Sequence, residues 1–156
     1  MNHQLYTQDS FFVAGIAVRT INLNGRAAED IGKLWQRFHP ENIGGQISNK
    51  YSDDIYCVYT DYETDHTGWY TAVLGFRVSE IINDGFFVAL VPSGNYRVYN
   101  SEGKIPESVG ETWMQIWRES DSRSYVADYD LYKTGAGNFK DAEVEIYVGY
   151  NKNNYL

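Results

Sequence analysis

The chain has 156 residues and a formal net charge of −8, and its length is typical of one domain, expected here to span residues 1–156. The negative charge argues against duplex DNA and anionic membranes as partners, because both need clustered Lys and Arg. With one cysteine, no leader peptide pattern and no run of eighteen apolar residues, we expect a cytoplasmic protein without disulfides or membrane spans.

The first half of the chain, residues 11–80, has the pattern of a strand, a helix and a hairpin. The predicted elements are a strand over Phe11–Arg19, a helix over Arg26–Phe38, a Gly-rich loop at 43–45, and paired strands over Ile55–Tyr62 and Trp69–Val78. Apolar residues of the helix recur at i, i+3, i+4 and i+7, and Pro40 prevents its continuation. Gly15 lies inside the first strand, where it indicates a bulge or a close approach of another backbone.

The second half, residues 86–150, repeats this order. Its predicted elements are a strand over Phe86–Pro92 that continues over Tyr96–Tyr99 after a turn or bulge, a helix beginning at Ser108, and strands over Tyr125–Tyr132 and Ala142–Tyr150 joined by a Gly-rich turn at 134–138. Ser108 and Glu111 have the S-x-x-E spacing of a capping box. The segments Ile55–Thr60 and Asp128–Lys133 align, because each is the first strand after a Trp-bearing helix. We predict an α+β fold of two pseudo-symmetric β-α-β-β units, with a curved antiparallel sheet, two main helices and a ligand cleft at the junction.

Six segments, taken in order, cover most of the chain. They are 12–20 (FVAGIAVRT), 30–38 (DIGKLWQRF), 55–63 (IYCVYTDYE), 91–96 (VPSGNY), 113–117 (WMQIW) and 144–150 (VEIYVGY). Their order and spacing resemble the effector-binding domain of AraC-type regulators and gyrase-inhibitory-like proteins, and most of all the integron-associated single-domain proteins of that family. The resemblance implies two β-α-β-β units and a cleft for hydrophobic cations or drug-like molecules. Some members are ligand domains of transcription factors, some inhibit gyrase and some hydrolyse small electrophiles.

One segment departs from the pattern that this resemblance implies. Multidrug-binding relatives have a D-F-E-x-Y strand whose buried Glu is the electrostatic centre of the pocket, and this chain has Asp128-Tyr129-Asp130-Leu131-Tyr132 in its place. Asp130 therefore stands at the Glu position with a side chain one methylene shorter. The ligand preference of relatives is for that reason not assumed to carry over.

Strand alternation places Asp128, Asp130 and Tyr132 on one face. We expect Tyr129 and Leu131, on the other face, to pack beneath the preceding helix. The acidic face then looks into the cleft or into water. In the cleft, a partly desolvated carboxylate beside phenols suits a cation; in water, it would belong to an edge strand kept soluble by its acids.

Aromatic residues make up 16% of the chain, more than core packing needs, so some should line a cavity or surface. The candidate ligand-binding residues are Asp130, Tyr132, Tyr59, Cys57, Trp113, Trp35, Tyr96 and Ile146. For Trp35 and Trp113 a role in the core stays open, because both lie on apolar helix stripes. Tyr96 either caps the rim of the pocket or continues an edge strand.

No catalytic residue, cofactor or metal site is predicted. His3, His39 and His66 lie in a tail, at a helix end and in a hairpin turn, so none is placed to form a triad with Cys57 or a serine. The acids at 61, 63 and 65 mimic the start of a calcium loop, but the required Gly and closing Glu are absent.

Three functions remain open. The first is a stand-alone binding protein for a small amphipathic, cationic and aromatic molecule, acting in sensing, sequestration or transcription-related regulation. The second is a small hydrolase, in which a carboxylate activates water beside a Tyr acid. The third is a protein-interaction module such as a gyrase inhibitor. The first is the main expectation, and the sequence leaves a protein partner or a homodimer open.

Overall fold

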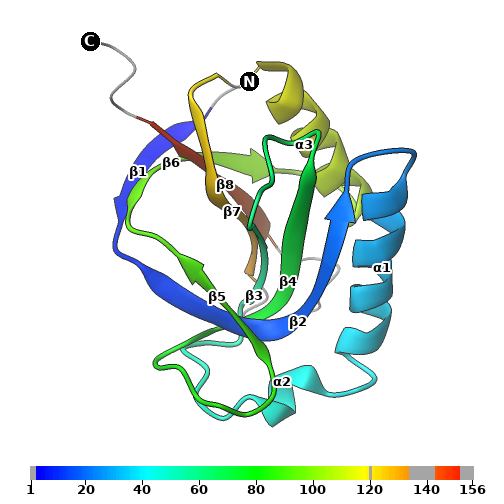
Figure 1. Ribbon diagram of the computed structural model, residues 1–156, viewed down its shortest axis with the longest axis vertical. Helices are drawn as coiled ribbons and strands as arrows, with labels where there is room; N and C mark the ends of the chain where they lie inside the picture. Colours follow the sequence, from blue (N-terminus) through cyan, green and yellow to red (C-terminus); the bar gives the residue numbers. More distant parts are fainter. Residues whose placement is uncertain (1–2, 120, 134–142, 152–156) are drawn as a thin grey trace.

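The computed structural model describes residues 3–119, 121–133 and 143–151 (Figure 1). The strands are β1 (Gln4–Gln8), β2 (Phe11–Ile21), β3 (Ile55–Thr60), β4 (Trp69–Val78), β5 (Phe87–Val91), β6 (Gly94–Ser101), β7 (Arg123–Lys133) and β8 (Glu143–Tyr150). The helices are α1 (Arg26–Phe38), α2 (Ile43–Gln46) and α3 (Glu107–Glu119). Among the described residues, no helix has both the length and the apolar character needed to cross a bilayer.

All eight strands form one antiparallel sheet in the order β1-β6-β8-β7-β3-β4-β2-β5. The first unit supplies β3, β4 and β2, the second supplies β7, β8 and β6, and the two units meet where β3 pairs with β7. In that pairing Cys57 lies directly opposite Asp130. The predicted α+β fold, with its curved antiparallel sheet of two matching units, is confirmed.

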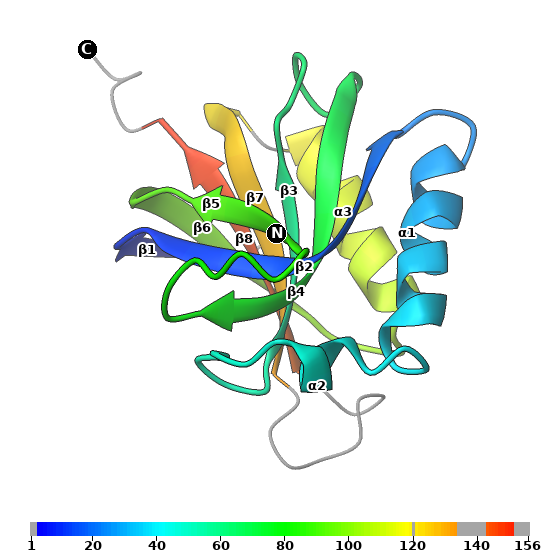
Figure 2. The same cartoon turned by 60° about the horizontal axis from the view of Figure 1, so that its bottom comes forward.

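The sheet curls so that its two ends approach each other, as Figures 1 and 2 show. The short links from β1 to β2 and from β5 to β6 cross between these ends. Gly15 and Gly75 face each other in the β2–β4 pair, and a Cβ on Gly15 would lie 2.0 Å from the Leu74 carbonyl oxygen. The close backbone approach predicted at Gly15 is therefore present, and no side chain fits there.

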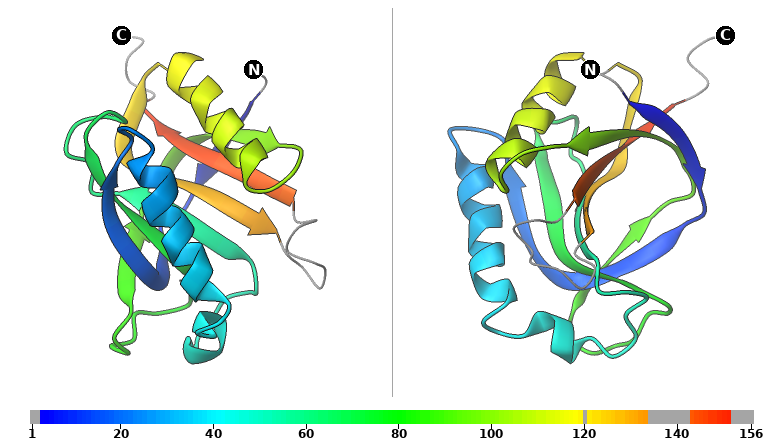
Figure 3. Two further views of the ribbon diagram at one scale, coloured as in Figure 1. Left: turned by 90° about the vertical axis from the view of Figure 1, so that its right-hand side faces the viewer. Right: turned by 180° about the vertical axis from the view of Figure 1, so that it is seen from behind.

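Each face of the sheet covers a separate cluster of buried side chains. α1 and α3 lie on the outer face (Figure 3), where Leu34 and Ile116 pack against sheet residues such as Leu74. A second cluster, which includes Tyr129 and Leu131, fills the inside of the curl. Tyr129 and Leu131 do not pack beneath the helix as predicted. Alternation shows which residues share a face, but the layer that each face meets depends on the direction in which the sheet curls.

Several local predictions differ from the structure. β1 was not expected; it pairs with β6. The segment expected as one interrupted strand from Phe86 to Tyr99 forms β5 and β6, which lie at different ends of the sheet. Part of the Gly-rich loop forms α2, where Asn42 accepts a hydrogen bond from the amide of Gly45. The predicted turn at 134–138 lies outside the described residues.

The prediction of a capping box at Ser108 and Glu111 is also wrong. α3 already begins at Glu107, and Ser108 is buried inside its first turn, with its Oγ unpaired among the described residues. The amide of Ser108 instead bonds to the carbonyl of Lys104. Residues ahead of Ser108 satisfy the start of the helix, so the S-x-x-E spacing has no capping role.

Candidate ligand-binding site

A cavity of about 670 Å³ lies between the two long helices and the outer face of the sheet. This volume is within the range of about 300–1,000 Å³ that is usual for small-molecule sites. Its walls come from α1, from α3, from the β3–β4 loop and from strands of both units. Lining residues of α1 and α3 are Ala27, Ala28, Ile31, Gly32, Trp35, Glu107, Val109, Gly110, Trp113 and Trp117.

Asp130 lies in the cavity wall on the central strand β7, with no solvent-exposed surface. The Tyr59 hydroxyl donates a hydrogen bond to its Oδ2 at 2.5 Å, and the Trp113 Nε1–H donates to its Oδ1 at 2.8 Å. Both donors are neutral, and no Lys, Arg or His among the described residues forms an ion pair with this carboxylate. If Asp130 ionises, its negative charge has no ion-pair partner among the described residues.

This environment changes the acidity of Asp130. Burial raises its pKa to about 7, because an ionised carboxylate is poorly solvated there, while the hydrogen bonds from Tyr59 and Trp113 act in the opposite direction. The nearby Asp128 adds a smaller upward effect. Burial and the Asp130 charge in turn raise the pKa of Tyr59 well above its ordinary value, so Tyr59 stays a donor. A cation in the cavity would favour the ionised carboxylate.

Asp128, two residues earlier on the same face, is by contrast fully compensated. Its Oδ2 accepts hydrogen bonds from Arg123 Nη2 at 2.8 Å and from the Tyr62 hydroxyl at 2.6 Å, and its Oδ1 accepts from the amide of Gly149 at 2.8 Å. Arg123 is itself buried, and although burial opposes it, the Asp128 charge raises the pKa of the guanidinium. The two acids of this strand therefore have different roles: Asp128 holds a buried ion pair, and Asp130 leaves a charge available.

Aromatic rings surround Asp130 inside the cavity. Tyr59 packs edge-on against Trp113 with ring centroids 5.4 Å apart, and against Tyr70 at 5.9 Å. Further along the cavity, Trp35 packs edge-on against Tyr132 at 5.0 Å. Because Tyr59 and Trp113 donate hydrogen bonds to the carboxylate, electron density shifts towards their rings, which strengthens their attraction for a cation.

Five of the predicted site residues come together at this cavity. These residues are Asp130, Tyr132, Tyr59, Trp113 and Trp35. Cys57 and Ile146 do not line it, although both lie on the same sheet face; both are buried within the core cluster on that face. Tyr96 points into the curl, where its hydroxyl donates to the carbonyl oxygen of Pro92 at 2.7 Å. Asp130 does not belong to an edge strand.

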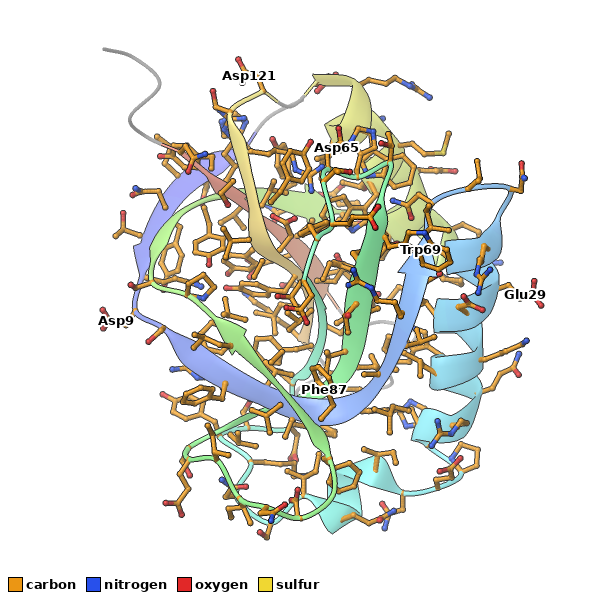
Figure 4. The ribbon with its side chains drawn as sticks, in the orientation of Figure 1. Asp9, Glu29, Asp65, Trp69, Phe87 and Asp121 are labelled. Atoms are coloured by element: carbon orange, nitrogen blue, oxygen red, sulfur yellow. The ribbon has the colours of Figure 1, made fainter. Side chains whose placement is uncertain are left out.

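The sequence reasoning missed several lining residues, Arg123 and His66 among them. A bulge between Arg123 and Asp128 shifts the register of β7 against β8. It brings the side chains of Arg123 and Asp128 to the same face of the sheet, although simple alternation would place them on opposite faces. His66 lies in the β3–β4 loop, which reaches the end of α3; Asp65 marks this loop in Figure 4. Its ring stacks on Trp117 with centroids 5.7 Å apart. The only signal for these residues in the sequence was Arg123, a basic residue that lies shortly before the acidic segment 128–132.

The described residues contain no cluster of three or more potential metal-binding side chains. Cys57 is buried, and burial raises the pKa of its thiol. A buried, protonated thiol is a poor nucleophile.

The sequence profile of the integron-associated effector-binding proteins (Cass2) matches residues 4–153. This chain belongs to that family. One relative, YobU of Bacillus subtilis strain 168, named as a candidate transcriptional regulator, is 31% identical over 146 residues, which cover 89% of this chain and 91% of YobU.

Solved structures show the same fold. An integron cassette protein from Vibrio cholerae has a TM-score of 0.77 at 24% identity, covering 97% of each chain. SAV2435, determined with tetraphenylphosphonium bound, has a TM-score of 0.78 at 20% identity, covering 97% of this chain and 95% of its own. At these identities the likeness establishes the fold.

Proposed function

We propose that this effector-binding protein holds a hydrophobic aromatic cation in the cavity between α1 and α3, as a sensor or sequestering protein. The observation that carries the proposal is Asp130, a fully buried carboxylate without a cationic partner among the described residues, on the wall of an aromatic cavity. Leaving such a group unpaired is costly in the empty protein, and a bound cation offsets that cost. The aromatic walls add stacking and cation–π attraction.

A solved structure with the same fold also supports the binding of an aromatic cation. SAV2435 was determined with tetraphenylphosphonium, a lipophilic aromatic cation. The present chain has the same fold and a cavity large enough for a drug-sized molecule. The hydrolase alternative stays a prediction, for which the hydrogen-bonded Asp130–Tyr59 pair supplies the required carboxylate and Tyr. The interaction-module alternative also stays a prediction.

Two nearly isosteric ions of opposite charge test the proposal. Tetraphenylphosphonium should quench Trp fluorescence on binding, since Trp35, Trp113 and Trp117 line the cavity. Tetraphenylborate, with the same shape and a negative charge, should bind more than tenfold more weakly, a difference of at least about 1.4 kcal/mol. Asp130→Asn should reduce the affinity for the phosphonium by roughly 30-fold, on the order of 2 kcal/mol. Equal affinity for the two ions would refute the proposed role of the carboxylate.

A further inference from the structure

A second polar group of the cavity is separate from Asp130. Arg123 and His66 both line the cavity, and Arg123 Nε, Arg123 Nη1 and His66 Nδ1 are buried atoms without a hydrogen-bond partner among residues 3–119, 121–133 and 143–151. Buried polar atoms are nearly always paired in folded proteins, so three unpaired atoms along one cavity call for an explanation. A ligand atom that enters the cavity would supply the missing partner.

The surroundings hold both side chains in place. Arg123 is only 7% exposed; its guanidinium carbon lies 4.3 Å from the centre of the Tyr125 ring, and its Nη2 donates a hydrogen bond to Asp128. The His66 ring is stacked on Trp117, and the His66 carbonyl oxygen accepts a hydrogen bond from Asn22 Nδ2 at 2.9 Å. Groups fixed in this way lose little conformational entropy when they bind a ligand. Arg123 and His66 are therefore preorganised to contact a ligand.

The charges near this group indicate what it can bind. Arg123 is neutralised by Asp128, and the next charge along the wall is Asp130. An anion here would meet two carboxylates against one guanidinium. An uncharged oxygen meets no such repulsion and can accept hydrogen bonds from Arg123 Nε and Nη1. Burial and the nearby Arg123 lower the pKa of His66, so at neutral pH its ring is uncharged and adds no repulsion towards a cationic ligand.

We propose that Arg123 and His66 form a second subsite for an uncharged oxygen of the ligand, a carbonyl or a hydroxyl. The favoured ligand would then be an aromatic cation that carries such an oxygen at the end of the cavity formed by the β3–β4 loop and the C-terminal turn of α3. This proposal rests on the proposed function, because it assumes that the cation lies beside Asp130. The subsite would make the protein selective for cations that carry an oxygen, which a simple lipophilic cation lacks.

Matched phosphonium ions provide the test. Triphenylphosphonium ions whose fourth ring carries a 3- or 4-acetyl group are compared with the corresponding isopropyl compounds, which have a similar shape and no oxygen. Wild-type protein should bind at least one acetyl compound about 3- to 10-fold more tightly than its isopropyl match, the range expected for a net hydrogen bond. The quantity followed is this ratio of dissociation constants, measured by Trp fluorescence and calorimetry.

Two variants test whether Arg123 and His66 cause the preference for the acetyl compounds. His66→Phe keeps a ring for stacking on Trp117 and removes Nδ1, and the pair Arg123→Met with Asp128→Asn removes both members of the ion pair together. The isopropyl-to-acetyl ratio of dissociation constants should fall towards one in each variant that remains folded by circular dichroism. His66→Phe keeps the test decisive if the double variant unfolds, because it leaves the ion pair intact.

The outcomes separate the two proposals. If wild-type protein binds all the phosphonium ions but shows no preference for acetyl, the oxygen subsite is refuted and the cation site stands. If the preference persists in His66→Phe and in the double variant, the oxygen contacts another wall and the assignment to Arg123 and His66 is refuted. If no phosphonium binds, both proposals fall.

Discussion

Replacing Asp130 with Asn should stabilise the empty protein at alkaline pH and remove a pH dependence of folding. Burial raises the pKa of this carboxyl to about 7 in the folded protein, and in the unfolded chain it returns to roughly 3.9. A group whose pKa is raised by folding stabilises the fold below its unfolded pKa. This contribution is lost as the pH rises from about 4 through about 7, because the folded protein must then ionise a buried acid.

The pKa values set the size of the effect. Between the two pKa values the free energy of unfolding should fall by about 1.4 kcal/mol per pH unit through this group, and by about 4 kcal/mol over the whole interval. Asn has a similar size and no ionisable proton. The stability of Asp130→Asn relative to wild type should therefore rise by up to about 4 kcal/mol between pH 4 and pH 9.

Urea unfolding followed by Trp fluorescence at several pH values measures this difference. Asp128→Asn is the matched control, because it makes the same change two residues away on the same strand face. That change leaves Arg123 buried without its partner, so it should destabilise the fold by about 3–5 kcal/mol at pH 8. The two substitutions should thus have opposite signs. Parallel pH curves for wild type and Asp130→Asn would refute the raised pKa and with it the uncompensated charge.

Two further predictions concern ligand binding. Wild-type affinity for tetraphenylphosphonium should increase about 20-fold from pH 5 to pH 9, because about 1% of Asp130 is ionised two pH units below a pKa of about 7 and the neutral carboxyl should bind roughly 30-fold more weakly, as Asp130→Asn does. Calorimetry in buffers of different ionisation enthalpy should detect proton release near pH 6, and a flat profile would contradict this coupling. Trp113→Phe removes a hydrogen bond that lowers the pKa of Asp130, so it should move the midpoint of this profile to higher pH, whereas an unchanged midpoint would show that the indole hydrogen bond does not tune the acid.

Local signals in the sequence were sufficient for some elements. The bounds of α1 agree with the predicted helix at Arg26–Phe38, because its apolar spacing and Pro40 are both short-range features. The separation of β5 from β6 was not predicted, since their partners β2 and β8 are distant in the chain. Which sheet edge a short strand joins depends on the curl of the whole sheet.

The candidate site was also predictable only in part from the sequence. Alternation placed Asp128, Asp130 and Tyr132 on one face, and the structure keeps them there. Alternation could not show that this face lies under the helices, or that Asp128 already has a partner. The partner is Arg123, which a bulge turns towards Asp128. A register shift of this kind leaves no clear mark in a single sequence.

The meeting of β3 and β7 has a consequence for how selectivity can change. Cys57 and Asp130 face each other across this central pair, and the alignment of Ile55–Thr60 with Asp128–Lys133 also equates them, so the local twofold axis passes between these two residues. Two acids on such an axis would repel each other and share a proton. The duplicated scaffold thus has room for one charge at its centre. A single substitution of Asp130 can therefore remove the charge on which the proposed selectivity for a cation depends.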